Sequence, residues 1–131
     1  AALGTAVGSR PRGRTLMLSQ PNRLLTTYAQ FWPFYLQEHA LAATRHIHFV
    51  GTAAALVLLG AGVAGGRAAF FLLALVAGYA PAWFAHFFVE KNRPATFTHP
   101  LWSLISDFRM AWLWITARLQ RELAKAGVRP R

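Results

Sequence analysis

Two long runs of apolar residues dominate the hydrophobic pattern of the chain. Phe49 to Gly66 contains 18 residues and Ala68 to Val89 contains 22. As helices they reach about 27 Å and about 33 Å, close to the ~30 Å hydrocarbon core of a bilayer. Gly65, Gly66 and Arg67 separate the runs and predict a tight turn. The pattern therefore predicts a transmembrane helical hairpin whose two outer ends return to the same side.

Aromatic segments flank this predicted hairpin on both sides. Leu24 to Leu41 is rich in aromatic residues, among them Trp and Tyr, which are enriched at membrane interfaces, and Pro33 interrupts it. Leu101 to Leu119 carries Asp107 and Arg109 inside an apolar pattern, so we expect these two charges to pair or to reach the aqueous boundary. No segment alternates as a β-strand would. The expected fold is all-α, an integral membrane helical bundle with a central transmembrane hairpin and one interfacial or spanning helix on each side.

The two ends of the chain differ in composition from this middle part. Residues 1–22 are rich in Gly, Arg, Pro and Ser without an apolar period, which predicts a disordered or loosely held basic segment. Met17 within it is a candidate translational start. Residues 23–120 form the expected membrane-embedded domain, and residues 121–131 form a basic C-terminal tail.

The charge distribution agrees with a membrane location. The net charge is +10, from 14 Lys and Arg against four Asp and Glu. The cations gather before and after the predicted hairpin, and only Arg67 lies at its far turn, as the positive-inside rule predicts for cytoplasmic termini. We expect an integral protein of a bacterial inner membrane or the endoplasmic reticulum, with membrane lipids around it and both termini cytoplasmic. A nucleic-acid partner is disfavoured because an apolar hairpin has no role in reading nucleic acid. The sequence leaves open whether the chain forms a homo-oligomer.

All five histidines lie in two polar blocks at the outer ends of the predicted hairpin. The first block contains His39, His46 and His48, and the second contains His86 and His99. Ionisable groups beside membrane-length apolar segments mark functional sites. The chain has no cysteine, so a metal here would be bound through nitrogen and oxygen.

The spacing within the second block favours a shared site. His86 and Glu90 are four residues apart, which places both on one helix face. Pro94 should end that helix. The turn predicted for residues 96–100 can then bring His99 back toward His86.

The spacing within the first block leaves two pairings open. His39 and His48 are nine residues apart, so they face one ion only if the helix breaks between them, for which the polar step at Thr44 and Arg45 is a candidate. On an unbroken helix, His39 would align with His46 instead.

Four separated blocks resemble the small membrane family of 2-hydroxy fatty acid dioxygenases, whose fungal member acts in fatty acid α-oxidation at the endoplasmic reticulum. The blocks are Tyr35-x3-His39, Arg45-x2-His48-Phe49-x-Gly51-Thr52, Trp83-x2-His86-x3-Glu90-Lys91-x-Arg93-Pro94-Ala95 and His99-Pro100, and the resemblance covers residues 24–120. The resemblance implies an Fe(II)-dependent dioxygenase that uses O₂ to shorten a 2-hydroxy fatty acid by one carbon. Thr44 departs from the family, in which Asn is frequent at this position.

The resemblance also implies which residues bind the metal. It selects His39, His48, His86 and His99 as ligands and leaves His46 aside. Four imidazoles on an octahedral Fe(II) ion leave two positions for substrate and O₂.

Several polar residues near the histidines are candidates for other roles. Glu90 is a candidate catalytic residue that fixes an imidazole tautomer, with an ion pair to a neighbouring cation as the alternative. Arg45 is a second candidate catalytic residue. It is also, together with Lys91 and Arg93, a candidate to bind the substrate carboxylate. The alternative for these cations is anchoring at the membrane surface. The acyl chain would lie along the apolar spans.

Two other functions compete with this reading. One is a zinc-dependent lipid hydrolase with histidine ligands and Glu90 as general base. The other is a haem-binding or purely structural membrane protein whose histidines are axial ligands or anchors.

Overall fold

The computed structural model describes residues 25–129, and within this range all regular structure is helical. The elements are α1 (Tyr28–Gln37), α2 (Ala42–Gly65), α3 (Ala69–Phe84), the π-helix η1 (Ala85–Glu90), the 3₁₀-helix η2 (Ala95–Phe97), α4 (Pro100–Ile115) and α5 (Leu119–Lys125). The all-α prediction is confirmed for this part of the chain. The segment predicted for residues 1–22, with Met17, lies outside the described residues.

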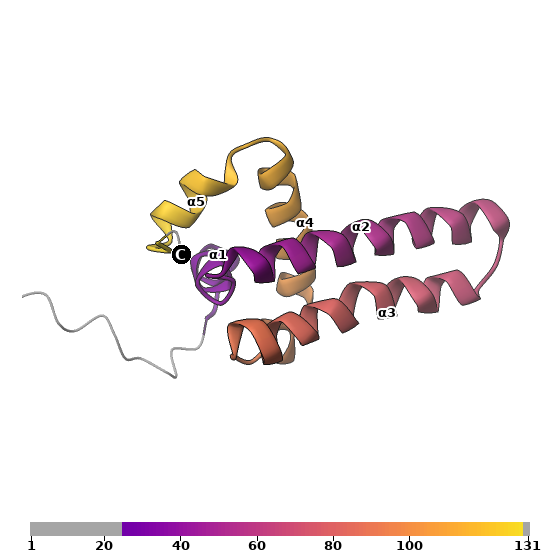
Figure 1. Cartoon of the computed structure of the whole chain (residues 1–131), viewed down its shortest axis with the longest axis horizontal. Helices are drawn as coiled ribbons and strands as arrows, with labels where there is room; N and C mark the ends of the chain where they lie inside the picture. Colours follow the sequence, from indigo (N-terminus) through magenta and orange to yellow (C-terminus); the bar gives the residue numbers. More distant parts are fainter. Residues whose placement is uncertain (1–24, 130–131) are drawn as a thin grey trace, which may run out of the picture.

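The predicted hairpin is formed by α2 and by α3 with its continuation η1 (Figure 1). Its turn lies where the glycines are: α2 ends at Gly65, and Gly66 has a φ of 62°. Glycine adopts this left-handed conformation without the steric cost that a Cβ imposes. The turn is therefore fixed by local sequence.

Two glycines let α2 and α3 approach each other closely. A Cβ built on Gly51 would lie 3.0 Å from the carbonyl oxygen of Ala77, and one on Gly62 would lie 3.1 Å from the Cβ of Phe70. Both distances are tighter than most Cβ contacts in proteins, so a larger residue at either position would require the neighbouring helix to shift by a few tenths of an ångström.

The hairpin helices are long and apolar enough to cross a membrane. Mean hydropathy reaches 2.0 in Ala42–Gly65 and 1.7 in Ala69–Glu90. Only 17% and 22% of the residues in these apolar windows are buried. Large apolar side chains such as Val57 and Leu72 therefore point outward, at 71% and 65% exposure.

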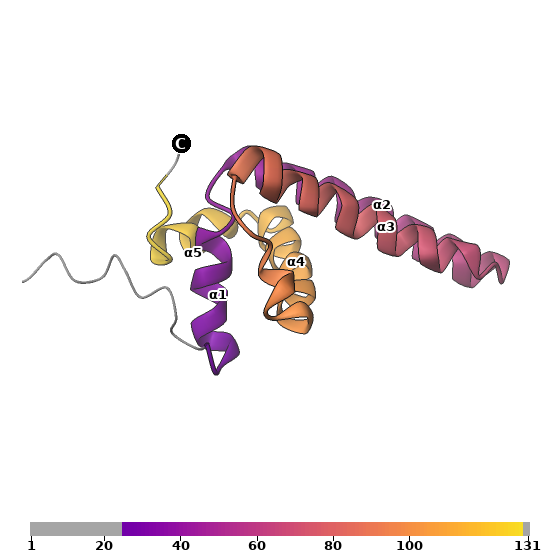
Figure 2. The same ribbon diagram turned by 90° about the horizontal axis from the view of Figure 1, so that it is seen from below.

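The helices α1, α4 and α5 gather at the open end of the hairpin, opposite its turn (Figures 1 and 2). Figure 2 shows α1 and α4 standing side by side across the end of the hairpin rather than along it. They enclose Phe31, Leu36 and Met110, whose side chains are fully buried. The flanking helices are thus arranged as a cap on the hairpin.

The helix α5 lies where the sequence pattern indicates only a basic tail. Its apolar residues Leu119 and Leu123, together with Ala126 just beyond it, are buried in the core formed with α1 and α4. The cations of this segment occupy the remaining faces. A short amphipathic helix therefore joins the cap.

Candidate metal centre

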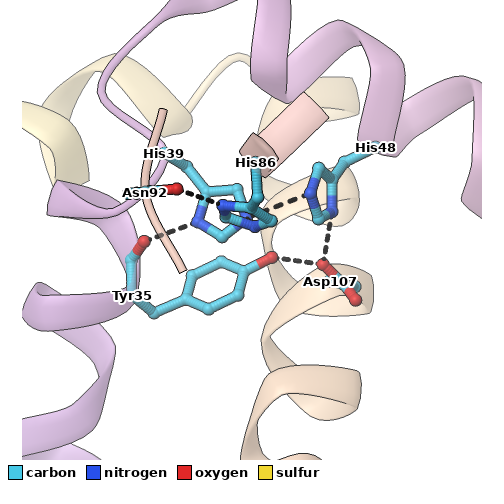
Figure 3. A network of polar contacts seen from close by, with 6 residues as sticks. All are labelled: Tyr35, His39, His48, His86, Asn92 and Asp107. Carbon is cyan, nitrogen blue, oxygen red and sulfur yellow. Dashed lines mark hydrogen bonds and ion pairs between the residues drawn. The ribbon is translucent and has the colours of Figure 1, made fainter. Parts of the chain in front are cut away.

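Three histidines converge where the hairpin meets the cap (Figure 3). Nε2 of His39 lies 3.2 Å from Nε2 of His48 and 3.1 Å from Nε2 of His86. The three side chains are only 1%, 5% and 2% exposed. Ligand atoms of all three lie within 4.8 Å of one another, so a single ion could contact all of them.

Each ring is oriented by an acceptor at its other nitrogen, as metal-bound histidines usually are. The Nδ1 acceptors are the Tyr35 carbonyl for His39 (2.7 Å), Asp107 Oδ1 for His48 (2.9 Å) and Asn92 Oδ1 for His86 (2.8 Å). The orientation of Asn92 is fixed because its Nδ2 donates to the carbonyl and the carboxylate of Glu38. Carbonyl and carboxylate oxygens only accept, so each Nδ1 carries the proton.

The protons on Nδ1 leave three Nε2 lone pairs directed at one another. Lone pairs at these separations repel unless a cation lies between them. Two nitrogens bound to one ion at about 2.1 Å lie about 3.0 Å apart at a right angle and about 3.4 Å apart at a tetrahedral angle. The observed 3.1 and 3.2 Å fall between these values. The residues therefore fit a first-row divalent ion bound by neutral imidazoles.

The burial of His39 favours the form that binds metal. Burial lowers the pKa of His39 well below its ordinary value, and the neighbouring His48 and His86 lower this pKa further. The ring is consequently neutral at physiological pH, and neutral imidazole is the metal ligand. The position between α1 and α2 is thus suited to binding a metal ion.

Asp107 on α4 belongs to the centre, although from the sequence we expect it only to pair with Arg109 or to reach the aqueous boundary. Its carboxylate accepts hydrogen bonds from His48 Nδ1 and from the hydroxyl of Tyr35. The Tyr35 ring is stacked on His39, with ring centroids 4.1 Å apart. Burial and the charge of Asp107 raise the pKa of Tyr35 well above its ordinary value, so its hydroxyl stays a donor. A carboxylate inside an apolar helix is the signal that points to this role.

Of the two outcomes expected for Asp107 and Arg109, pairing with each other or reaching the aqueous boundary, the structure does not show the pairing. Arg109 turns to the cap, where its Nη2 lies 3.9 Å from Glu122 and its guanidinium lies over the ring of Trp32. The two charges are two residues apart on α4 and so point in different directions. Asp107 is left to serve the centre.

The pairing left open in the first histidine block is settled by a break at residues 38–41. His39 lies in this link and α2 begins at Ala42, so His39 is not in helical phase with His46. His46 is exposed near Trp114, at a ring distance of 6.3 Å. The helix does break, but the position predicted for the break, at Thr44 and Arg45, is wrong because both residues belong to the first turn of α2.

Glu90 and Arg45 hold this link from both sides. Glu90 accepts hydrogen bonds from the backbone N–H groups of residues 40 and 41, at 3.0 and 3.1 Å, and from Thr44 Oγ1 at 2.6 Å. Arg45 Nη1 donates to the carbonyls of His39 and residue 40, at 2.8 and 2.7 Å. The expected contact between Glu90 and an imidazole is replaced by this network, which places His39.

Lys91 and Arg93 are exposed on either side of Asn92. Lys91 has a φ of 60°, and this left-handed residue ends η1 and turns the chain so that Asn92 returns to His86. The two cations therefore stand close to the centre without being part of it.

His99 lies outside the group of three histidines. Its Nε2 is 3.3 Å from the carbonyl oxygen of Leu25, and its ring is stacked on Trp102 with centroids 4.9 Å apart. The turn before α4 directs His99 toward the start of α1, where its centroid is 5.2 Å from that of Phe31, and not back toward His86. The structure thus brings together three of the four predicted ligands.

Comparison with known protein families gives a match over most of the chain. The profile of the family described as 2-hydroxy-palmitic acid dioxygenase Mpo1-like matches residues 25–119. This range contains the three converging histidines, the acceptors that orient them, and His99. No curated protein and no solved structure matches the chain significantly. Because the profile covers most of the chain, this protein belongs to the Mpo1-like family of 2-hydroxy-palmitic acid dioxygenases.

Proposed function

We propose that this chain is an Fe(II)-dependent membrane dioxygenase that uses O₂ to shorten 2-hydroxy fatty acids by one carbon. The observation that carries the proposal is the convergence of three buried, oriented Nε2 lone pairs in a chain of this family. Haem does not suit this site, because Nε2 of His39 lies only 3.2 and 3.1 Å from Nε2 of His48 and His86, which leaves no room for a macrocycle between the rings.

Iron fits the donor set and the reaction. Neutral imidazoles suit Fe(II), and three of them leave three octahedral positions for a 2-hydroxy acid and O₂. Ferrous iron bound there would supply electrons and open coordination positions. One 2-hydroxy acid and one O₂ balance a shortened acid, carbon dioxide and water, so no external reductant is required.

The residues around the histidines have separable tasks. Asp107 keeps the proton of His48 on Nδ1 and accepts from Tyr35, which holds both rings in place. The near-complete burial of the three histidines excludes bulk water. Glu90 acts through the link as a positioning residue, because its hydrogen bonds go to residues 40–44.

Three cations are candidates to attract and hold the substrate carboxylate. Arg45 contacts the histidine centre directly, because it donates a hydrogen bond to the carbonyl of His39. Lys91 and Arg93 flank Asn92, the residue that orients His86. A guanidinium binds a carboxylate through two parallel hydrogen bonds, which favours the arginines for this task.

The acyl chain is proposed to lie beside α3. A wholly apolar cavity of about 450 Å³ is lined there by Leu75, Val76, Tyr79, Ala80, Trp83 and Thr96. Tyr79 also lines a smaller hollow of about 50 Å³ that reaches Asp107. Tyr79 borders both spaces, and we propose that a chain in the large cavity directs its polar end past this side chain toward the histidines.

The membrane supplies the surroundings that the hairpin requires. A core helix of a water-soluble protein is mostly buried, whereas most of the apolar surface of α2 and α3 faces outward. We propose that the hairpin crosses the bilayer and that α1, α4 and α5 lie at the boundary near its open end. The charge distribution supports the proposal that this end, with both termini, faces the cytoplasm.

The test is metal analysis and oxygen consumption of protein purified without oxygen. We expect one iron per chain, no Soret band, and O₂ uptake with 2-hydroxypalmitate but not with palmitate, which lacks only the hydroxyl group. Zinc in place of iron together with no O₂ uptake would refute the proposal and favour a hydrolase. A Soret band would favour the haem alternative.

A further inference from the structure

A second concave site lies between α4 and α5, lined by none of the residues of the histidine centre. The hollow measures about 350 Å³ and is lined by Arg109, Leu113, Arg118, Arg121, Glu122 and Lys125. Four cations face one carboxylate, which gives the site a formal charge of +3. Concave clusters of cations with this excess attract anions.

The floor of this hollow is held in place by aromatic residues of α1. The guanidinium of Arg109 lies 4.1 Å from the ring centroid of Trp32 and 5.7 Å from that of Tyr28, in cation–π geometry. Trp32 Nε1 donates to Glu122 Oε2 at 3.1 Å, and Lys125 Nζ lies 2.7 Å from Glu122 Oε1. Arg109 and Glu122 are therefore ordered before any ligand arrives.

The rim of the hollow is formed by two arginines that a sharp turn brings back over α4. Ala117 has a φ of 57°, a conformation that residues other than glycine rarely adopt. The N–H of Arg118 then bonds to the carbonyl of Leu113 at 2.8 Å, which folds α5 against α4. Arg118 and Arg121 are exposed and make no ion pair within residues 25–129. Their guanidinium groups are available to an incoming anion.

We propose that this hollow binds the phosphate group of an anionic phospholipid. Guanidinium groups match the oxygens of phosphate with paired hydrogen bonds, and three of them border the hollow. The neighbouring part of α4 exposes Trp112 and Ile115, at 63% and 70%, which suits contact with acyl chains. The choice of a lipid as the source of the phosphate rests on the proposed membrane location, whereas the phosphate chemistry itself does not.

The test is binding of phosphatidylglycerol, phosphatidylcholine and inorganic phosphate to the full chain in neutral detergent, by native mass spectrometry and by the shift in unfolding temperature. The double variant Arg118→Gln with Arg121→Gln removes the rim. The control, Arg67→Gln with Arg129→Gln, removes the same charge from exposed positions outside the hollow. The helical signal in far-UV circular dichroism and the unfolding temperature without lipid establish that both variants fold.

We expect wild type to prefer phosphatidylglycerol over phosphatidylcholine. The rim variant should bind phosphatidylglycerol at least about tenfold more weakly, because it loses charged hydrogen bonds, and the control should bind as wild type does. Equal weakening in both variants, or no preference between the two lipids, would overturn the site. Binding of inorganic phosphate with no gain from phosphatidylglycerol would overturn the lipid assignment and identify a free phosphate as the ligand. None of these readings depends on the oxygenase activity.

Discussion

Replacing Asp107 by Asn tests whether this carboxylate orients the metal centre. The amide oxygen can still accept from His48 Nδ1–H and from the Tyr35 hydroxyl, which both bond to Oδ1, but it carries no charge and therefore holds both donors more weakly. Losing the hydrogen-bond partner of a metal-binding histidine costs about 10- to 100-fold in metal affinity, or about 1.4 to 2.7 kcal/mol. Asp107 is 21% exposed, so water can replace part of the lost contact. We therefore expect iron binding weaker by about tenfold, at the lower end of this range.

Glu122→Gln is the matched control for this substitution. Glu122 is 20% exposed and likewise holds two side-chain donors, Trp32 Nε1 and Lys125 Nζ, but it contacts no histidine in the described part of the chain. Anaerobic competition titration with a chromophoric iron chelator measures affinity, and thermal unfolding of the metal-free proteins measures stability. Unchanged iron affinity in Asp107→Asn would refute the role assigned to Asp107. Equal loss in the control would show that general destabilisation is responsible.

Three further predictions concern the ligands, the pH dependence and the acyl cavity. His99→Ala should keep its iron, as should the exposed control His46→Ala, and loss of iron from His99→Ala alone would establish His99 as a fourth ligand. Below about pH 6.5 histidine is protonated in the unfolded chain, whereas burial lowers the pKa of His39 in the folded protein and keeps it neutral. The unfolding temperature of the metal-free protein should therefore fall as the pH falls, and His39→Gln should reduce this dependence. Ala80→Trp should fill part of the cavity beside α3 and shift O₂ uptake toward shorter 2-hydroxy acids, whereas an unchanged chain-length profile measured across a homologous series would contradict the cavity assignment.

The hairpin could be predicted from sequence because its determinants are local. Helix length follows from the apolar runs, and the turn follows from Gly65 and Gly66. Three of the four predicted ligands meet in the structure. Only the family resemblance could select them from the sequence, because periodicity leaves two pairings open in the first histidine block. The position of the break before α2 could not be predicted from local sequence. The link at residues 38–41 contains neither glycine nor proline, and it is held by Glu90, about 50 positions further along the chain.

The acceptors around the ligands depend on tertiary structure in the same manner. Asp107 reaches His48 only because α4 lies across the end of the hairpin, and no spacing rule relates residues so far apart. The displacement of His99 has a similar origin, since the stacking on Trp102 is decided by how α4 meets α1. The amphipathic period of α5 is short and lies within a basic segment, so composition conceals it.

The separation of Asp107 from the histidines along the chain sets the order in which the protein matures. His48 and Asp107 are 59 residues apart, whereas α2 and α3 are joined by a turn of a few residues. The hairpin can therefore assemble during synthesis while α4 is still inside the ribosome. Nascent or prematurely terminated copies would carry three imidazoles without the carboxylate that steadies one of them. Such copies would bind iron more weakly than completed chains, by about the same tenfold factor expected for Asp107→Asn.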